Sequence, residues 1–306
     1  MKIKSMFVYG LLFFVIITEN AKSEVPKVFE WAQSNFINIE SVKYTLIKEL
    51  NDSGLVWTTK TVSEWQLYHR IDYKNFDKDG VLITSYAEAL TQDYLQIFYV
   101  EDRFLRLYKP EIKPANVLKW QPYLFSCFDF LYDMDSDLKH LHLYKAKVLL
   151  AKVSEVLEEK VIVTKRQYQN KGEVSSIDLP QETLKFFSKK VFYRVFYDSK
   201  TGELFGWELR LSDNPIKLLQ EFVIIKAEYY KDRNSKIPPI WYPVLVKHYY
   251  YGWDEENLYD KPTHFLKYTT TLAQFNELEE TDAMIDPAEA KVIRDEMNGK
   301  NIFLSP

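Results

Sequence analysis

The feature that most constrains the fold is a regular alternation in the C-terminal half of the chain. Between residues 204 and 211, large apolar side chains (Phe205, Trp207, Leu209, Leu211) alternate with Gly206, Glu208 and Arg210. A period of two is typical of a β-strand with one covered face. Aromatic residues suit half-buried pleated surfaces, and they form 16% of this sequence. The chain is therefore predicted to be mainly β.

Comparable runs predict a dozen or so strands in one antiparallel sheet with helices on a single face. The expected strands are 42–49, 55–59, 62–72, 81–89, 94–100, 103–108, 153–157, 160–168, 191–197, 204–211, 221–231, 240–253 and 263–275. Turns are expected at 77–80 and 198–202, where Asp and Gly punctuate the pattern. No stretch between the strands has the composition of a flexible linker, so we expect one domain.

Four helices are expected between or beside these strands. They cover 27–36, a segment from Pro122 through Leu131, 137–152 and 287–297. The last is marked by Asp286 as N-cap and Pro287 at the first position. Its apolar stripe is thin, so the expected helical tail, 284–306, should dock weakly and its deletion should cost little stability.

The N-terminus has the order of a secretory signal peptide. Lys2 and Lys4 precede an uncharged, mostly apolar run, and Ala21 and Ser23 are small residues before an expected cut at Glu24. The apolar run is shorter than the roughly 20 residues of a bilayer span. We therefore expect export after removal of residues 1–23, with an uncleaved anchor as the alternative.

Charge and cysteine usage exclude several classes of protein. With 40 basic and 44 acidic residues and no dense basic stripe, the chain is not expected to bind nucleic acid or an anionic membrane surface. Its one cysteine allows no intramolecular disulfide. Cys127 lies in an apolar run without a nearby histidine, so we interpret it as a small buried hydrophobe rather than a nucleophile.

No sequence motif for catalysis or metal binding is complete. The run from Asp133 to Asp137 begins like a calcium loop, but the required Gly and Glu are replaced by Leu138 and Tyr144. His140 and His142 form a close pair without the further ligands of a zinc site. No nucleophile elbow or phosphate loop is present. We therefore expect no cofactor, no metal and no enzyme activity.

Large apolar residues exceed the ordinary needs of one core and predict a ligand pocket. The candidates on the strands are Trp65, Leu67, Phe205, Trp207, Val223 and Ile225. The candidates on the covering helix, a lid, are Leu124, Phe128 and Leu131. The aromatic runs 241–243 and 249–253 also suit carbohydrate stacking, although a strand covered on both sides gives the same pattern.

The order of elements resembles the LolA/LolB-like lipoprotein-carrier superfamily. The features that carry the resemblance are helix 28–36 before strand 42–49, the arm-turn-arm 195–209, Trp241-Tyr242-Pro243 after 228–232, and the ending 286–295. The chain resembles an extended, divergent member. The resemblance implies an α+β fold that is mainly antiparallel β, a curved, unclosed β-barrel (half-barrel) with helices covering its concave face. The family's lid-locking arginine has three candidate counterparts, Arg103, Arg106 and Arg210.

These observations predict a periplasmic or envelope protein with three parts. They are the signal peptide 1–23, a half-barrel domain 24–283 with a helical insert around 115–152, and the tail 284–306. The expected function is to hold a lipid, an acyl chain or an acylated protein in an apolar hollow, without catalysis. The alternatives are an exported glycan hydrolase, which needs two carboxylates about 5 to 9.5 Å apart, and an envelope scaffold that binds other proteins.

Overall fold

The computed structural model describes residues 25–109 and 161–304, apart from short gaps at 53, 66–67, 92, 187–188, 213–216, 232–237 and 253–258. The expected signal peptide, the helices expected from 122 to 152 and the strand expected at 153–157 lie outside the described residues. Those predictions stay predictions.

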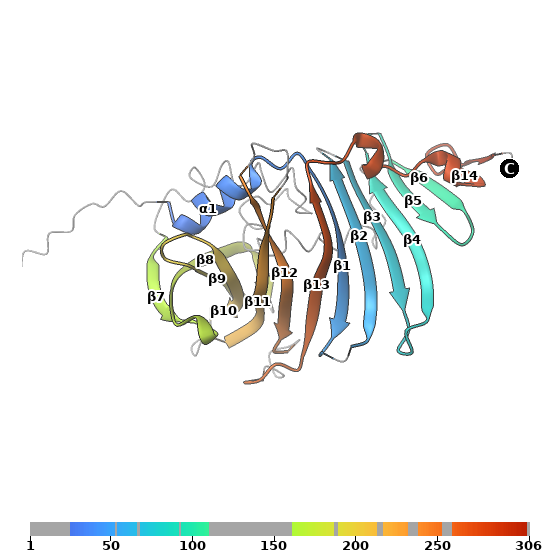
Figure 1. Ribbon diagram of the computed structural model, residues 1–306. Helices are drawn as coiled ribbons and strands as arrows, with labels where there is room; N and C mark the ends of the chain where they lie inside the picture. Colours follow the sequence, from blue (N-terminus) through green and yellow to red (C-terminus); the bar gives the residue numbers. More distant parts are fainter. Residues whose placement is uncertain are drawn as a thin grey trace, which may run out of the picture.

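The described residues form one sheet of fifteen strands in the order β15-β14-β6-β5-β4-β3-β2-β1-β13-β12-β11-β10-β9-β8-β7. The strands are β1 (Ser41–Leu50), β2 (Val56–Trp65), β3 (Tyr68–Phe76), β4 (Leu82–Leu90), β5 (Leu95–Tyr99), β6 (Phe104–Tyr108), β7 (Val163–Gln167), β8 (Glu173–Phe186), β9 (Lys189–Tyr197), β10 (Leu204–Leu211), β11 (Lys217–Tyr230), β12 (Ile240–Tyr250), β13 (His264–Phe275), β14 (Val292–Asp295) and β15 (Lys300–Phe303). Neighbouring strands are antiparallel except β14 and β6. The described sheet does not close, because β15 and β7 are its two edges (Figure 1).

Most of the expected strands are confirmed, including the hairpin of β5 and β6 and the arm-turn-arm of β9 and β10. Two expectations are wrong in detail. The single strand expected at 62–72 is the end of β2 and the start of β3, which pair with each other. Strand β8 was not expected, because Ser175, Ser176 and Asp178 interrupt its apolar pattern and Pro180 lies within it.

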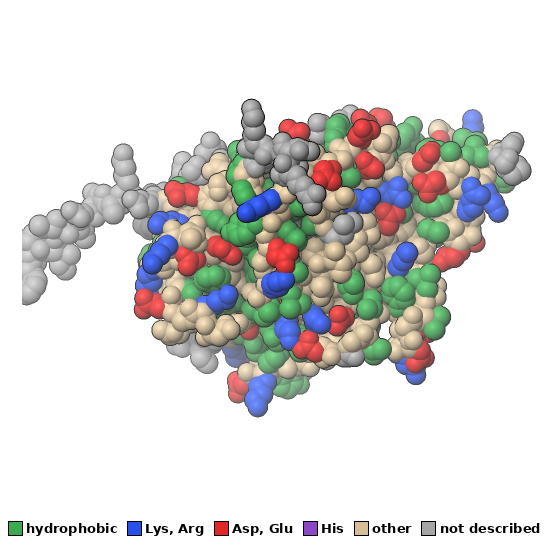
Figure 2. All heavy atoms as spheres, viewed as in Figure 1, with side chains coloured by type: hydrophobic (Ala, Val, Ile, Leu, Met, Phe, Trp, Pro, Cys, Tyr) green, Lys and Arg blue, Asp and Glu red, His purple; other side chains and the backbone are tan. Residues whose placement is uncertain are grey.

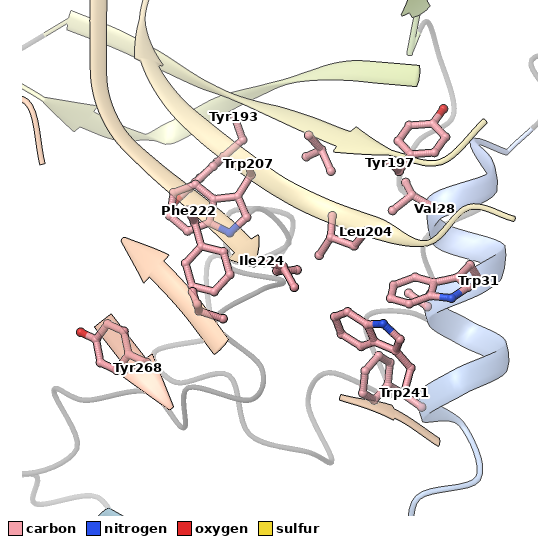
Figure 3. Close-up of a cluster of buried hydrophobic side chains, with 14 of the residues drawn as sticks. Val28, Trp31, Tyr193, Tyr197, Leu204, Trp207, Phe222, Ile224, Trp241 and Tyr268 are labelled. Carbon is pink, nitrogen blue, oxygen red and sulfur yellow. The ribbon is translucent and has the colours of Figure 1, made fainter. Parts of the chain in front are cut away.

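The helix expected at 27–36 is confirmed as α1 (Lys27–Phe36). It packs on the sheet through Trp31, whose ring meets the ring of Trp241 edge-on at 4.9 Å (Figure 3). The close approach requires glycine in the turn between β9 and β10, because a Cβ at Gly202 would lie 2.3 Å from the Lys27 carbonyl oxygen. We call the sheet face that α1 covers the inner face, and the opposite one the outer face.

The largest buried cluster lies on the inner face, and most of its members belong to β8–β12 and α1, which we call the helix-covered half. Trp207 is 1% exposed and stacks on Phe222 with ring centroids 5.2 Å apart. Tyr193 meets the Trp207 ring edge-on at 5.0 Å. Figure 3 shows Tyr193, Trp207, Phe222 and Ile224 side by side, and Trp241 beside Trp31 of α1.

The chain end corrects the prediction of a helix at 287–297. Asp286 does cap the chain by accepting a hydrogen bond from the Ala288 amide, but the turn is a short 3-10 helix that ends at Glu289. The chain then forms β14, which pairs in parallel with β6. The expected helix is wrong because pairing with β6 satisfies the backbone while Ile293 becomes buried, and this outweighs the local capping signal.

This tail forms a second buried cluster, and it lies on the outer face. Ile285, Ala290 and Ile293 pack there against β4–β6, on Ala87, Ala89, Phe98 and Leu105. We call β2–β6 together with this tail the tail-covered half. Ile285 is fully buried, so the reason given for weak docking, a thin helical stripe, does not hold.

None of the helices in the described part of the chain has the length and hydropathy needed to cross a lipid bilayer. On the face drawn in Figure 2, basic and acidic side chains are interspersed, and neither sign forms a continuous patch. That face therefore offers no broad cationic surface to a polyanion.

Candidate functional site

A row of polar and aromatic side chains crosses the inner face of the tail-covered half. Lys60 on β2 lies opposite Tyr73 on β3, which lies opposite Tyr86 on β4. Tyr86 lies opposite Tyr99 on β5, and Tyr99 opposite Phe104 on β6. Residues directly opposite in antiparallel strands are side by side, so the row is continuous over five strands.

The members of the row contact one another through their rings and cationic groups. The rings of Tyr73 and Tyr86 stack with centroids 4.6 Å apart and an angle of 11° between planes. The Lys60 Nζ atom lies 5.2 Å from the centre of the Tyr73 ring. Such cation–π contacts stabilise a cation that has lost part of its hydration. The row therefore holds an ammonium group beside aromatic faces.

A hollow of about 230 Å³ opens beside this row. Its lining consists of Lys48, Thr58, Lys60, Tyr73, Asn75 and Tyr86. The Asn75 side chain is fixed there, since it accepts from Thr58 Oγ1 at 3.2 Å and donates to Thr84 Oγ1 at 3.0 Å. The Tyr73 hydroxyl is buried and has no hydrogen-bond partner among the described residues. The lining is rich in donors.

Burial shifts the titration of these groups. It lowers the pKa of Lys60 to about 8, with a further lowering by the neighbouring charge of Lys48 and an opposing effect of Glu88. Burial also lowers the pKa of Lys48. The pKa of Tyr86 is raised to about 12, mainly by burial, and that of Tyr73 is raised further for the same reason. Both phenols therefore stay protonated near neutral pH and can donate hydrogen bonds.

The hollow adjoins the apolar part of the inner face. Leu46 lies directly opposite Lys60, and Val62 and Ile71 form the next pair along β2 and β3. All three are at most 5% exposed and belong to the main buried cluster. A polar, donor-rich hollow thus lies at the end of a continuous apolar surface, which is an arrangement suited to a molecule with a polar head and an apolar chain.

The residues predicted from sequence as pocket candidates are not gathered in one place. Trp207 is in the main core, and Trp65 is half-buried beside the ring of Tyr68, 5.7 Å away. Val223 is buried, whereas Ile225 is 46% exposed. Leu67, Leu124, Phe128 and Leu131 lie outside the described residues.

Phe205 belongs to a separate cluster on the outer face. It packs against Tyr168 and Phe196, whose rings stack 4.1 Å apart. Lys171 lies over the Phe205 ring at 5.0 Å. A local bulge at this residue explains the misplacement, because Leu204 and Gly206 are opposite consecutive residues of β9 and the face of the strand changes between them. The alternation in the sequence does not reveal such a bulge.

The lysine and the tyrosines of the row were missed because they come from separate strands whose register the sequence alone does not give. A signal was present, however, since Lys60, Tyr73, Tyr86 and Tyr99 recur at intervals of 13 residues. A regular interval is what a series of similar hairpins produces when one residue of each strand falls in the same row.

The three arginines considered as counterparts of the family's lid-locking arginine lie in three different surroundings. Arg106 lies over the rings of Tyr99 and Phe104. Arg210 binds Glu208, and Arg103 donates a hydrogen bond to the Glu289 carbonyl.

A second hollow, of about 460 Å³, lies on the outer face of β7–β11. Glu208 and Glu221 are directly opposite each other in it. Glu208 binds Arg210 at 2.6 Å, and Glu221 accepts from Gln169 at 3.0 Å and from Tyr251 at 3.1 Å. Both carboxylates of this hollow are thus engaged by side chains of the protein itself. Among the described residues, no group of three His, Cys, Asp or Glu side chains is placed to hold a metal ion.

The sequence matches no protein family model and no curated protein. Among solved structures, the chain is similar to a domain from Vibrio parahaemolyticus named for outer-membrane lipoprotein sorting, with 10% identity, a TM-score of 0.38 and coverage of 85% of this chain and 97% of that one. It is similar to a LolA superfamily protein from Nitrosomonas europaea, with 6% identity, a TM-score of 0.41 and coverage of 86% and 98%.

A third similar structure is LprF from Mycobacterium bovis, with 10% identity, a TM-score of 0.31 and coverage of 86% of this chain and 96% of that one. The LolA superfamily is among the structural neighbours. The resemblance expected from the sequence is confirmed to this extent: the similar structures include proteins named for the LolA superfamily and for lipoprotein sorting. Because each TM-score is below 0.5, we base the function on this chain's own side chains.

Proposed function

We propose that this protein is an exported, non-catalytic binding protein that holds a lipid, an acyl chain or an acylated protein against the inner face of its sheet. The observation that carries the proposal is the donor-rich hollow at the end of the apolar inner surface, next to Leu46, Val62 and Ile71. Burying an acyl chain is favourable by about 0.8 kcal/mol per methylene. Binding of this kind needs apolar area and no catalytic group.

The helices expected between residues 115 and 152 belong to the same proposal. They would cover the concave face, with Leu124, Phe128 and Leu131 toward the ligand. The expected place of action is the periplasm or cell envelope, after removal of residues 1–23.

The test is a series of uncharged straight-chain alcohols that displace a fluorescent apolar probe from the full mature chain. The affinity should rise about fourfold for each added methylene until the surface is filled. A Thr58→Trp variant should weaken binding at least tenfold, because Thr58 lines the hollow. Thr59→Trp is the matched control, since its side chain is on the opposite face of the same strand. Affinity that does not depend on chain length would contradict the proposal.

A glycan hydrolase is the second candidate, because Glu208 and Glu221 face each other in the outer hollow. Their hydrogen bonds to Arg210, Gln169 and Tyr251 favour a structural role over acid–base work. Release of reducing ends from cell-wall glycans by the wild-type protein, and its loss in Glu221→Gln, would favour the hydrolase instead.

A further inference from the structure

We infer that the inner-face hollow binds the acidic head group of an amphiphile, a carboxylate or a phosphate, between Lys48 and Lys60. The inference rests on the proposed function and names the chemical class of its ligand.

The first support is the placement of the two cations. Lys60 is opposite Leu46 on β1, and Lys48 is two residues further along β1 on the same face. The two side chains are therefore diagonal neighbours and line one hollow. The charge of Lys48 adds to burial in lowering the pKa of Lys60, and an anion between the two lysines would oppose that effect.

The second support is the set of hydrogen-bond donors around the cations. The Tyr73 side chain is 2% exposed, lines the hollow, and its hydroxyl has no hydrogen-bond partner among the described residues. A buried hydroxyl without a partner is costly, and an anionic oxygen would satisfy it with a charge-assisted bond. The Tyr86 hydroxyl and the Asn75 amide are further polar groups of the lining.

The third support is the sign of the remaining charges. None of the six lining residues is acidic. The acidic group that raises the pKa of Lys60 is Glu88 on β4, which lies opposite Ile71 in the next row and is 5% exposed. A cationic head group such as choline would therefore meet two ammonium groups, and none of the described lining residues would offer it a carboxylate.

The experiment compares ligands that share one 14-carbon chain and differ only in the head: tetradecanol, tetradecanoate and tetradecyl phosphate. Wild-type protein at pH 7 should bind the two acids at least tenfold more tightly than the alcohol. Lys60→Met and Lys48→Met should each lose most of that preference, measured within each variant as the ratio of acid affinity to alcohol affinity. Lys74→Met is the matched control, because Lys74 is on β3 but exposed on the outer face, and it should keep the full preference.

The two acids distinguish the source of the head group. Tighter binding of the carboxylate indicates a free fatty acid, and tighter binding of the phosphate indicates a phospholipid-derived ligand. Isothermal titration at pH 8.5 in buffers of different ionisation enthalpy should also show proton uptake with either acid and none with the alcohol.

The outcomes separate the two proposals. Equal affinity for the alcohol and the acids would overturn the head-group inference, and so would a preference that survives in the Lys48→Met/Lys60→Met double variant. Either result would leave the proposed function, binding of an apolar chain, standing. Binding of none of the three ligands overturns the proposed function itself. Binding of the alcohol by each variant also reports that the variant is folded.

Discussion

The two halves of the sheet are covered by flanking segments on opposite faces. The helix-covered half has its core on the inner face, where the stacked rings of Trp207 and Phe222 belong to the same buried cluster as Trp31 of α1. The tail-covered half has a core on the outer face, where the tail covers Phe98 and Leu105. One continuous sheet thus has two differently placed cores.

This difference explains where a polar hollow can exist. In the tail-covered half, burial of the outer face supplies stability, so part of the inner face is available for Lys60, Tyr73 and Tyr86. In the helix-covered half the inner face is filled by aromatic rings in contact. A half-buried lysine there would take the place of one of these packed rings. It would also bury a charge without compensation, which is strongly destabilising.

The largest expected effect concerns the inner core. Trp207→Ala should lower the free energy of unfolding by about 3 to 5 kcal/mol, because it removes a side chain that is 1% exposed and leaves a cavity. Trp57→Ala is the matched control, since Trp57 is 41% exposed on β2, and it should cost less than about 1 kcal/mol. Urea unfolding of both variants measures the difference. Similar losses would show that the inner core is not the main source of stability.

The second effect concerns the outer core. Ile293→Ala should cost about 2 to 4 kcal/mol, because Ile293 is 7% exposed and packs in the cluster with Leu105. Ile302→Ala tests the same change on the paired strand β15, where the side chain is 50% exposed, and should cost far less. A negligible loss in Ile293→Ala would mean that the tail is dispensable and that the two-core comparison fails.

The sequence was sufficient to predict the strands whose pattern is locally complete. Strand β10 alternates regularly, and α1 has a clear apolar stripe, so both were found. The tail was mispredicted because its local capping signal is real, while the partner that decides its structure, β6, is about 190 residues earlier in the chain. The site was missed for a similar reason, because the row from Lys60 to Tyr86 exists only once the register of three strands is known.

The third effect is sensitivity of the helix-covered half to acid. His248 is packed edge-on against Trp207 at 5.4 Å and is held by Gln220 and Tyr250, and burial lowers its pKa to about 3. The unfolded chain binds more protons between that value and about 6.5, so stability should fall as the pH falls through this window, by about 2 kcal/mol at pH 4.5. His248→Gln should flatten that part of the stability curve. His264→Gln should flatten it less, because burial also lowers the pKa of His264 but its side chain is half-exposed.

The smallest expected effect has the opposite pH dependence and belongs to the tail-covered half. The pKa of Lys60, lowered to about 8 by burial, is below the 10.5 of an unfolded lysine. The unfolded chain therefore binds more protons between pH 8 and 10, and stability from this group should rise with pH there, by about 1 kcal/mol for a half-buried side chain. Above pH 10 the raised pKa values of Tyr73 and Tyr86 act in the other direction, so the window closes. The measurement is the difference in unfolding free energy between wild type and Lys60→Met from pH 7 to 10, with Lys74→Met as the exposed control. A difference that stays constant across that range would show that Lys60 is well hydrated. The inner face of the tail-covered half would then hold no partly desolvated charge, and in this respect it would not differ from the helix-covered half.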